Sequence, residues 1–335
     1  MFSSHIPIQP IPEIAASVMI PGNLSEHPAV CAWRKLQPAC VDPGSIDVLK
    51  RNKKSAIYRL HGIGPGASAV IAKRCVTTTA LTERLIYQDV LPALALPGLR
   101  YYGCIEDCST EFHWLFLEDA GSSPYLPVLP AHRRAGARWL AHMHTSAAES
   151  PVAAVLPDRG PGFYLEQLRL ARKNILDSCS NPALQARDLA VLQELTAQCD
   201  FLESRWDQVQ RICQNAPQTL VHGDLKAKNI RIQDTPKGIA VLAFDWELAG
   251  WGIPATDLLR CPDLDLYRSE TRGTWPGLDG QRLRKLVEVG KLFRALIAIY
   301  WKSLALSFPW VEWPVEKLRL YRSALAEAIE SLGIK

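Results

Sequence analysis

The hydrophobic pattern of this chain changes at about residue 120, and that change limits the folds open to it. Before this point, short runs rich in Ile, Val and Tyr alternate with turns, which is typical of antiparallel strands. These runs are residues 46–51, 55–60, 68–75, 100–104 and 112–117, with one helical pattern over residues 82–94. Beyond residue 124 the apolar residues recur at helical spacing, over residues 131–145, 162–176, 182–215 and 281–307. We therefore predict an α+β fold, sheet-rich at first and mainly helical afterwards.

The helical part has one exception, a predicted β-hairpin within residues 219–245. Its two apolar runs, residues 230–232 and 239–244, are separated by Asp-Thr-Pro-Lys-Gly, a sequence that favours a turn. Polar residues stand at both ends of the hairpin. The segment from His222 to Asn229 precedes the first run, and Asp245 follows the second.

Length and composition limit the class of protein further. The chain has 335 residues, which exceeds the usual size of one compact core and favours two lobes. Hydrophobic residues make up 48% and charged residues 21%, which argues against disorder. The net charge is only +4, so we expect neither a nucleic-acid nor a membrane partner. No apolar stretch approaches the ~18 residues of a membrane span.

The cysteines and the N-terminal sequence bear on the compartment. The nine cysteines are odd in number and scattered, unlike the framework of a disulfide-rich secreted protein. Residues 1–22 lack a basic region followed by an apolar run, so no signal peptide is expected. Reduced thiols and a cytoplasmic protein are the interpretation that fits both.

Four segments follow from these patterns. Residues 1–45 are expected to form a partly helical extension, with helical patterns over residues 12–19 and 27–36. Residues 46–118 would form a lobe with a sheet and one helix. The turn-rich residues 119–123 would be a hinge, and residues 124–335 a helical lobe that contains the hairpin.

The polar residues around the hairpin suit phosphoryl transfer. That reaction needs a carboxylate to orient the attacking hydroxyl and accept its proton, and oxygen ligands for Mg²⁺. Asp224, followed five residues later by Asn229, and Asp245 beyond the hairpin could supply these groups from one small unit. Lys226 could reach the phosphate that is transferred and offset its charge.

These residues resemble the aminoglycoside phosphotransferase and choline kinase family, distant relatives of the protein kinases. The pattern His-Gly-Asp-x-x-x-x-Asn matches at residues 222–229, and Asp-Trp-Glu at residues 245–247 stands where protein kinases have Asp-Phe-Gly. The resemblance covers roughly residues 45–330. It implies a bilobal protein-kinase-like fold, with Asp224 as the base and Asn229 and Asp245 as Mg²⁺ ligands. It also implies ATP or GTP as the phosphate donor and a small-molecule hydroxyl as the acceptor.

The predicted first lobe contains candidates for the other roles in this reaction. Lys73 lies on a predicted strand and Glu83 on the next helix. In the kinase fold such a Lys holds the α- and β-phosphates and is positioned by the helix Glu. An ordinary surface ion pair is the structural alternative. The segment around Leu117 and Asp119 resembles the hinge whose backbone receives the adenine.

The loop over the phosphates is not expected at the glycine-rich residues 62–66. In the kinase pattern that loop joins the first two strands and the Lys lies on the third. Asn52 precedes Lys73 by 21 residues, which leaves room for two strands and a turn. The loop should therefore lie at residues 52–55, with Ser55 and Lys53 near the phosphates. Solvation of an exposed turn remains an equal alternative for its lysines.

Three nearby residues are expected to be structural. His222 lies two residues before Asp224, which already fills the role of base. Asp257 is expected to bond the backbone of the catalytic loop, and His144 to pack behind that loop.

The acceptor stays open, as an antibiotic or a metabolite. Several Trp residues lie beyond Asp245 in the sequence. Aromatic side chains in the wall of a site suit sugars and nucleosides, although positions in the core would explain these residues too. Asp263, Asp265 and Glu270 could bind an amino sugar or simply face solvent. A protein kinase is the alternative enzyme, but eleven residues between Asp245 and Asp257 are too few for a long activation loop. A nucleotide-binding scaffold without catalysis is the third alternative.

Overall fold

The computed structural model describes residues 18–19, 23–52, 54–107, 111–236 and 238–335. The chain divides into two compact units. The first comprises Met1–Arg84 and Leu99–Ala120, and the second Leu85–Gly98 and Gly121–Lys335.

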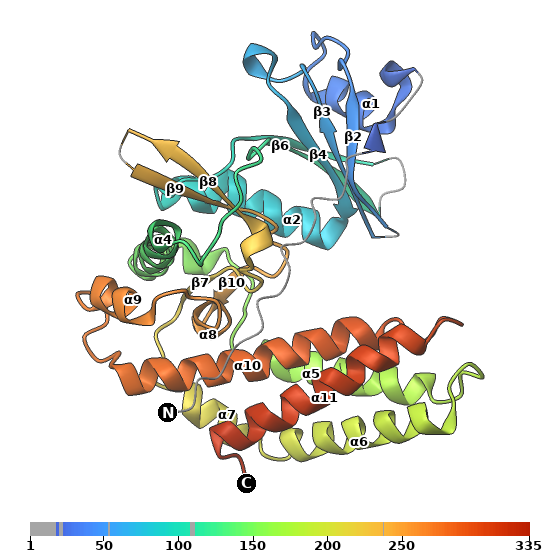
Figure 1. Ribbon diagram of the computed structural model, residues 1–335, viewed down its shortest axis with the longest axis vertical. Coiled ribbons are helices and arrows are strands. Elements are labelled where there is room, and N and C mark those ends of the chain that lie inside the picture. The colour runs from blue at the N-terminus through green and yellow to red at the C-terminus, as the bar shows by residue number, and fades with distance from the viewer. Residues whose placement is uncertain (1–17, 20–22, 53, 108–110, 237) are drawn as a thin grey trace. The chain divides into compact units, whose positions relative to one another are not determined.

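A six-stranded sheet forms the first unit (Figure 1). Its strand order is β1-β2-β3-β4-β6-β5, and every neighbouring pair is antiparallel. The strands are β1 (Val18–Met19), β2 (Ile46–Arg51), β3 (Ser55–Leu60), β4 (Val70–Val76), β5 (Tyr101–Glu106) and β6 (Phe112–Glu118). The helices α1 (Pro28–Leu36) and α2 (Thr77–Leu85) accompany them, with short 3-10 turns at Leu24–Glu26 and Pro65–Ala67.

Helix α1 covers one face of this sheet. Side chains alternate across a strand, so Ala56, Tyr58 and Leu60 of β3 point to the same side. They pack with apolar residues of β4 and β6 against Val30 and Trp33 of α1. The N-terminal extension is therefore part of the core of the first unit.

Helix α2 follows β4 directly, and its Ala80 packs against Cys75 and Leu115 on the other face of the sheet. Lys73 shares that face, because it is two residues from Cys75 along β4 and pairs with Leu115 across to β6. The helical pattern predicted over residues 82–94 begins earlier, at Thr77, and is not one regular helix. A π-helical segment (Ile86–Val90) precedes α3 (Leu91–Ala93), where Pro92 has no N–H to donate to the preceding turn.

The helix predicted over residues 12–19 is wrong at its end. Residues 12–17 lie outside the described part of the chain, and β1 pairs Val18 with Val48 and Met19 with Asp47. A strand edge offers unpaired backbone N–H and C=O groups, and two extended residues suffice to bond it. The helix predicted over residues 27–36 is confirmed as α1.

The second unit is mainly helical. Its longer helices are α4 (Pro130–Ala148), α5 (Pro161–Ser178), α6 (Ala186–Glu203), α7 (Trp206–Cys213), α9 (Leu264–Thr271), α10 (Gly280–Ser303) and α11 (Glu312–Leu332). The short elements are α3, α8 (Ala255–Leu258) and 3-10 turns at Pro151–Ala154 and Ala227–Asn229. Two small antiparallel pairs complete it: the hairpin β8 (Ile230–Thr235) with β9 (Gly238–Ala243), and β7 (Thr219–Val221) with β10 (Gly250–Gly252). Helices α5, α6, α10 and α11 pack side by side (Figure 1).

Two helix predictions in this unit need correction. The pattern over residues 182–215 forms two helices, α6 and α7, because the chain leaves helical geometry at Arg205. Helix α11 is missing from the prediction, although Val315, Leu318 and Leu325 lie at helical spacing on its buried face. The predicted hairpin is confirmed. None of the helices in the described ranges has both the length and the apolar character needed to cross a membrane.

Replacing Trp33 by Ala should lower the free energy of unfolding by about 3–5 kcal/mol, because the indole fills the core between α1 and the sheet. Urea unfolding followed by circular dichroism would measure this. Val41→Ala is the control in the same unit, since Val41 is exposed, and its effect should stay within about 0.5 kcal/mol. An equal effect of both changes would contradict the role given to α1.

Candidate active site

The loop between β7 and β8 carries the predicted catalytic residues. Strand β7 is fully buried and pairs with β10, with Val221 opposite Gly250 and Thr219 opposite Gly252. The hairpin β8–β9 then returns the chain to Asp245. The segments before and after the hairpin are thereby brought together.

Asp257 holds the backbone of this loop. Its Oδ2 accepts a hydrogen bond from the main-chain N–H of His222 at 2.7 Å, and its Oδ1 accepts one from the N–H of Gly223 at 3.0 Å. Gly223 has φ +78°, and a Cβ there would lie 2.6 Å from the carbonyl oxygen of Leu248. Only glycine fits this turn, and the predicted role of Asp257 is confirmed.

His144 supports Asp257 from behind. Its Nε2 lies 3.3 Å from Asp257 Oδ2, and its Nδ1 lies 2.8 Å from the hydroxyl of Tyr267. These contacts assign Nε2–H as donor to the carboxylate and Nδ1 as acceptor from Tyr267. Thr219 donates to the backbone oxygen of His144 at 2.6 Å. The predicted position of His144 behind the catalytic loop is confirmed.

His222 is fully buried and uses both ring nitrogens within the loop. Its Nδ1 accepts from the backbone N–H of Asp224 at 3.3 Å, and its Nε2 lies 3.2 Å from the carbonyl oxygen of Phe244. The ring is therefore neutral, with the proton on Nε2. Burial lowers the pKa of His222, although nearby carboxylates oppose the shift. The ring also packs on Trp246, with 4.4 Å between centroids.

Asp224 is paired with two cations. Lys226 Nζ lies 2.8 Å from its Oδ1 and 3.0 Å from its Oδ2, and Arg294 Nη1 lies 2.9 Å from Oδ1. The exposed fraction of the Asp224 side chain is only 11%. Burial lowers the pKa of Lys226, and the charge of Arg294 lowers it further, while hydrogen bonding to Asp224 opposes both. Arg294 is not among the residues predicted from the sequence, because it lies on α10, 70 residues beyond Asp224.

Asn229 and Asp245 are the candidate metal ligands. Asn229 Nδ2 donates to the backbone oxygen of Asp224 at 3.1 Å, which leaves its amide oxygen available as a ligand. The N–H of Phe244 bonds to the backbone oxygen of Asn229 at 3.0 Å, so Asp245 directly follows the residue that pairs with Asn229. Asp245 has φ +70°, a conformation rare outside glycine. An amide and a carboxylate oxygen are hard donors, so this set fits Mg²⁺.

In the first unit, Lys73 and Glu83 form the predicted ion pair. Lys73 Nζ lies 2.7 Å from Glu83 Oε1, and the exposed fractions of the two side chains are 8% and 0%. The pair is buried, so the alternative of a surface ion pair is wrong. Burying two charges is costly unless they are paired, and such pairs are common at functional sites.

The turn between β2 and β3 is built around Asn52. Its side-chain oxygen accepts from the N–H groups of Lys54 and Ser55, both at 2.9 Å. Ser55 Oγ is buried and has no hydrogen-bond partner within the described part of the chain. Lys53, also predicted here, lies outside the described residues. The glycine-rich residues 62–66 lie instead between β3 and β4.

The predicted adenine-binding segment is at the end of β6. Leu117 is buried in the sheet. The carboxylate of Asp119 binds the guanidinium of Arg59, with distances of 2.7 Å to Nε and 3.3 Å to Nη2. The side chain of Asp119 therefore has a structural partner, and a role in adenine binding would use its backbone. The predicted residues thus form two groups, one in each unit.

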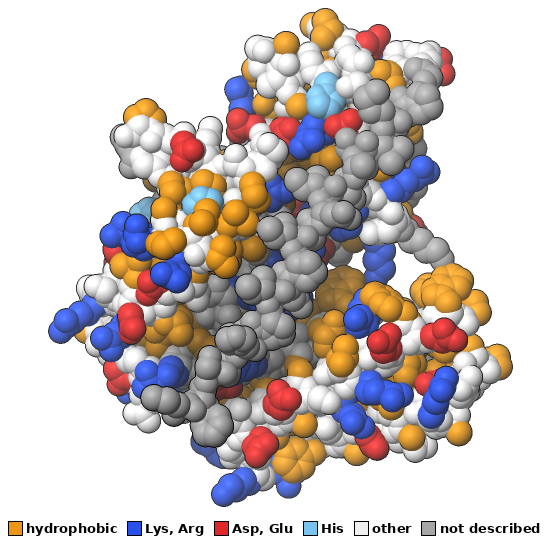
Figure 2. Space-filling view, viewed as in Figure 1, with side chains coloured by type: hydrophobic (Ala, Val, Ile, Leu, Met, Phe, Trp, Pro, Cys, Tyr) orange, Lys and Arg blue, Asp and Glu red, His pale blue; other side chains and the backbone are white. Residues whose placement is uncertain are grey.

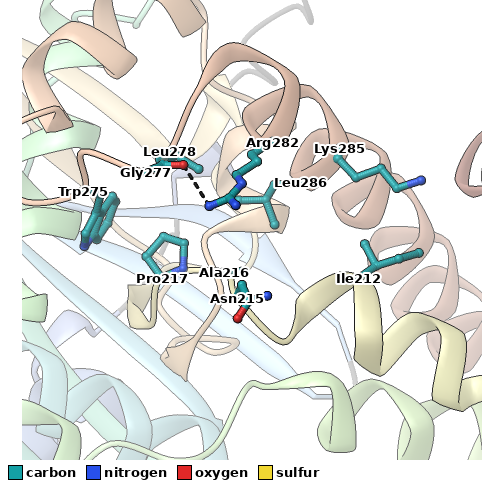
Figure 3. A pocket seen from close by; sticks show the side chains of 10 residues that line it. All are labelled: Ile212, Asn215, Ala216, Pro217, Trp275, Gly277, Leu278, Arg282, Lys285 and Leu286. Carbon is teal, nitrogen blue, oxygen red and sulfur yellow. Dashed lines mark hydrogen bonds between the residues drawn. The ribbon is translucent and has the colours of Figure 1, made fainter.

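The cavity beside the start of α10 and the Trp residues of the second unit do not together outline one acceptor site. A cavity of about 490 Å³ beside the start of α10 contains none of the predicted site residues (Figure 3). Trp246 is buried, while Trp310 and Trp313 are exposed near the turn between α10 and α11, where hydrophobic side chains gather (Figure 2). Of the acidic candidates, Asp263 caps α9, Asp265 is exposed in the first turn of α9, and Glu270 pairs with Arg138 at 3.1 Å.

The fold and the site define a phosphotransferase of the protein-kinase-like class. The model of the phosphotransferase enzyme family (APH) matches residues 66–290, so this chain belongs to that family. The predicted family, the bilobal α+β kinase-like fold and the enzyme class, a nucleotide-dependent phosphotransferase acting on an alcohol group, are confirmed. The division into lobes at residues 46–118, 119–123 and 124–335 stays a prediction.

Solved structures resemble the chain over most of its length. The GDP and kanamycin complex of APH(2″)-IIIa has 15% identity and a TM-score of 0.61, covering 89% of this chain and 98% of that one. Choline kinase from Cryptosporidium parvum has 12% identity and a TM-score of 0.55, covering 86% and 90%. Ethanolamine kinase from Plasmodium vivax has 14% identity and a TM-score of 0.56, covering 88% and 89%. No curated protein sequence matches the chain.

Lowering the pH should destabilise the protein through His222. The pKa of the folded state lies below the ordinary value of 6.5, so below about pH 6.5 the unfolded chain binds a proton that the folded chain does not. The free energy of unfolding should fall with decreasing pH until the folded pKa is reached, by up to ~1.4 kcal/mol per pH unit. Urea unfolding between about pH 7.5 and 5 measures this dependence.

The variant His222→Gln should lose part of that pH dependence, because its side chain does not titrate. His142→Gln is the control, since His142 is exposed on α4, and it should leave the dependence unchanged. If His222→Gln kept the full dependence, the proton uptake would belong to other groups.

Proposed function

We propose that this protein is a small-molecule kinase that transfers the γ-phosphate of ATP or GTP to an acceptor hydroxyl, with Asp224 as the base. The observation that carries the proposal is the loop from His222 to Asn229, whose backbone is held by Asp257 so that Asp224 and Asn229 have defined positions. Phosphoryl transfer depends mainly on such positioning and on charge stabilisation.

The proposed step conserves atoms and charge. The acceptor hydroxyl donates a hydrogen bond to Asp224, its oxygen attacks the γ-phosphorus, and the bond to the bridging oxygen of the nucleoside diphosphate breaks. The hydroxyl proton passes to Asp224 and then to solvent. Lys226 pairs with Asp224 in the structure. During the reaction it would offset negative charge on the phosphate that is transferred.

Asn229 and Asp245 would hold Mg²⁺ through their side-chain oxygens. When bound, the metal neutralises charge on the nucleotide phosphates. The hydrogen bond from Asn229 Nδ2 to the backbone oxygen of Asp224 would orient the amide oxygen of Asn229 as a ligand.

In the first unit, Lys73 would bind the α- and β-phosphates, with Glu83 as its positioning partner. Ser55 supports a phosphate role for the turn after β2, because a buried hydroxyl without a partner is unusual unless a ligand completes it. Lys53 belongs to the same turn, and the end of β6 at Leu117 and Asp119 would contact the base of the nucleotide. GDP in the APH(2″)-IIIa structure keeps GTP open beside ATP.

A protein substrate is disfavoured by the segment after Asp245. It enters the β7–β10 pair within five residues and reaches α8 at Ala255, and α8 is buried throughout. Arg159 bonds this segment at the carbonyl oxygen of Leu248, with 3.1 Å from Nε. This segment is too short to contain a loop that could accommodate a peptide substrate.

Asp224→Asn and Asp245→Asn should fail in different ways. Asp224→Asn removes the base but keeps the metal ligands, so turnover should fall by about 10²–10⁴ while the affinity for Mg-nucleotide survives. Asp245→Asn removes a ligand, so it should also raise the Mg²⁺ concentration needed for nucleotide binding. Thermal shift with Mg-ATP and Mg-GTP measures binding, and phosphate transfer or slow nucleotide hydrolysis measures turnover.

Wild-type protein with neither nucleotide binding nor hydrolysis at millimolar Mg-ATP or Mg-GTP would overturn the kinase proposal. Equal loss of nucleotide binding in both variants would refute the separate roles of Asp224 and Asp245. Binding without any turnover across a broad acceptor screen would favour the non-catalytic scaffold.

Ser55→Ala should weaken nucleotide binding by about 2–10-fold, the weight of one hydrogen bond, without loss of stability. The hydroxyl has no partner to lose among the described residues, so any effect reports on the ligand. Gly64→Ala is the matched comparison. A Cβ at Gly64 would lie 2.5 Å from Ser68 Oγ, so that change should lower the melting temperature and leave nucleotide affinity intact. The reverse outcome would assign the phosphates to the glycine-rich turn.

A further inference from the structure

A second cavity in the helical unit is lined in part by a residue that contacts the catalytic loop. Its volume is about 380 Å³, and it lies among the end of α8, one face of α10 and one face of α11. Arg294 is part of its lining and also contacts Asp224 at 2.9 Å. One side chain therefore connects this cavity to the carboxylate proposed as the base.

The charged lining of this cavity is mainly positive. Arg260, Lys291 and Arg294 line it, with Glu327 as the only acidic residue among them. Lys291 is paired with Glu288 at 2.8 Å, and Arg294 with Asp224. Arg260 is exposed, and its side chain has no partner in the parts of the chain that the structure describes. Lys226 adds a further positive charge beside Asp224.

Such a lining would repel a cationic acceptor. An amino sugar needs carboxylates near its ammonium groups, and none of the acidic candidates Asp263, Asp265 and Glu270 lines this cavity. Asp263 caps α9, and Glu270 pairs with Arg138. The charge beside Asp224 comes instead from guanidinium and ammonium groups, which bind carboxylates and phosphates.

We propose that the acceptor is a hydroxylated anion, a sugar phosphate or a sugar acid, and that Arg294 is the residue that selects it. The anionic group binds in the cavity between α8, α10 and α11, on Arg294 and Arg260, while a hydroxyl of the same molecule reaches Asp224. This inference rests on the proposed function, because it names the acceptor of that reaction. Arg294 forms its ion pair with Asp224 when no acceptor is bound, and the acceptor anion takes over part of that pairing.

Four probes with one carbon skeleton test the charge preference: D-glucose, D-glucose 6-phosphate, D-gluconate and D-glucosamine. Thermal shift and calorimetry on the nucleotide-free protein give binding, and Mg-ATP or Mg-GTP consumption gives turnover. Either anionic probe should bind and be phosphorylated better than glucose, and glucosamine should be poorest. Comparing glucose 6-phosphate with gluconate shows whether the site prefers a phosphate or a carboxylate. Raising the salt concentration should weaken the preference, because screening acts on exposed charges.

Arg294→Gln should weaken binding of the preferred anionic probe by about 10-fold or more, the usual weight of a charge-assisted hydrogen bond. Arg260→Gln should give a smaller loss in the same direction, and it keeps the test valid if Arg294→Gln folds poorly. Arg284→Gln is the matched control, since Arg284 is exposed on the same helix and lies outside this cavity. It should leave both binding and turnover unchanged.

The outcomes separate the acceptor from the reaction. Mg-nucleotide binding with a preference for glucosamine, or with no charge preference, would overturn the acceptor class and leave the kinase proposal standing. Equal stabilisation by sulfate at the same ionic strength would reduce the cavity to a general anion site and overturn the acceptor role. Loss of Mg-nucleotide affinity in Arg294→Gln would assign Arg294 to the nucleotide instead. If the wild type failed to bind nucleotide, the kinase proposal would fail, and the binding arm would still decide the anion preference.

Discussion

The position of the catalytic loop depends on two hydrogen bonds that one buried carboxylate accepts. Asp257 accepts the N–H groups of His222 and Gly223, and this places the loop that carries Asp224 and Asn229. Asp257 itself is held by His144, whose ring is held in turn by Tyr267. A buried carboxylate without these partners would be too costly to keep, so the loop and its support stabilise each other.

The same carboxylate connects the catalytic loop to α10. Asp257 lies on α8, and Gly290 of α10 lies so close to α8 that a Cβ there would be 2.1 Å from the carbonyl oxygen of Ala255. Four residues further along α10, one turn of the helix, Arg294 reaches Asp224. The close packing of α10 against α8 thus places the guanidinium of Arg294 beside Asp224.

The fold does not identify the acceptor. The solved structures that resemble this chain include a kanamycin complex, a choline kinase and an ethanolamine kinase, at identities of 12–15%. A scaffold shared across such different ligands leaves specificity to the side chains placed around it. In this chain the basic side chains of Lys226 and Arg294 contact Asp224, and Arg294 also lines a cavity together with Arg260 and Lys291.

The sequence by itself determined the local elements and the motif chemistry. Strands β2 and β3 have the predicted bounds. The polar residues of the loop at residues 222–229 directly precede the hairpin, as predicted. Alternation, helical spacing and turn residues report on contacts within a few residues of the chain, so they can be recognised without a structure. The Lys73–Glu83 pair could also be predicted, because the strand and the helix that carry it follow one another in the sequence.

Only the tertiary structure decided the remaining contacts. The pairing of β1 with β2 and the contact of Arg294 with Asp224 join positions that are far apart in the sequence and share no local pattern. Packing of whole elements against one another brings such groups together, and it leaves no periodic signal in the sequence.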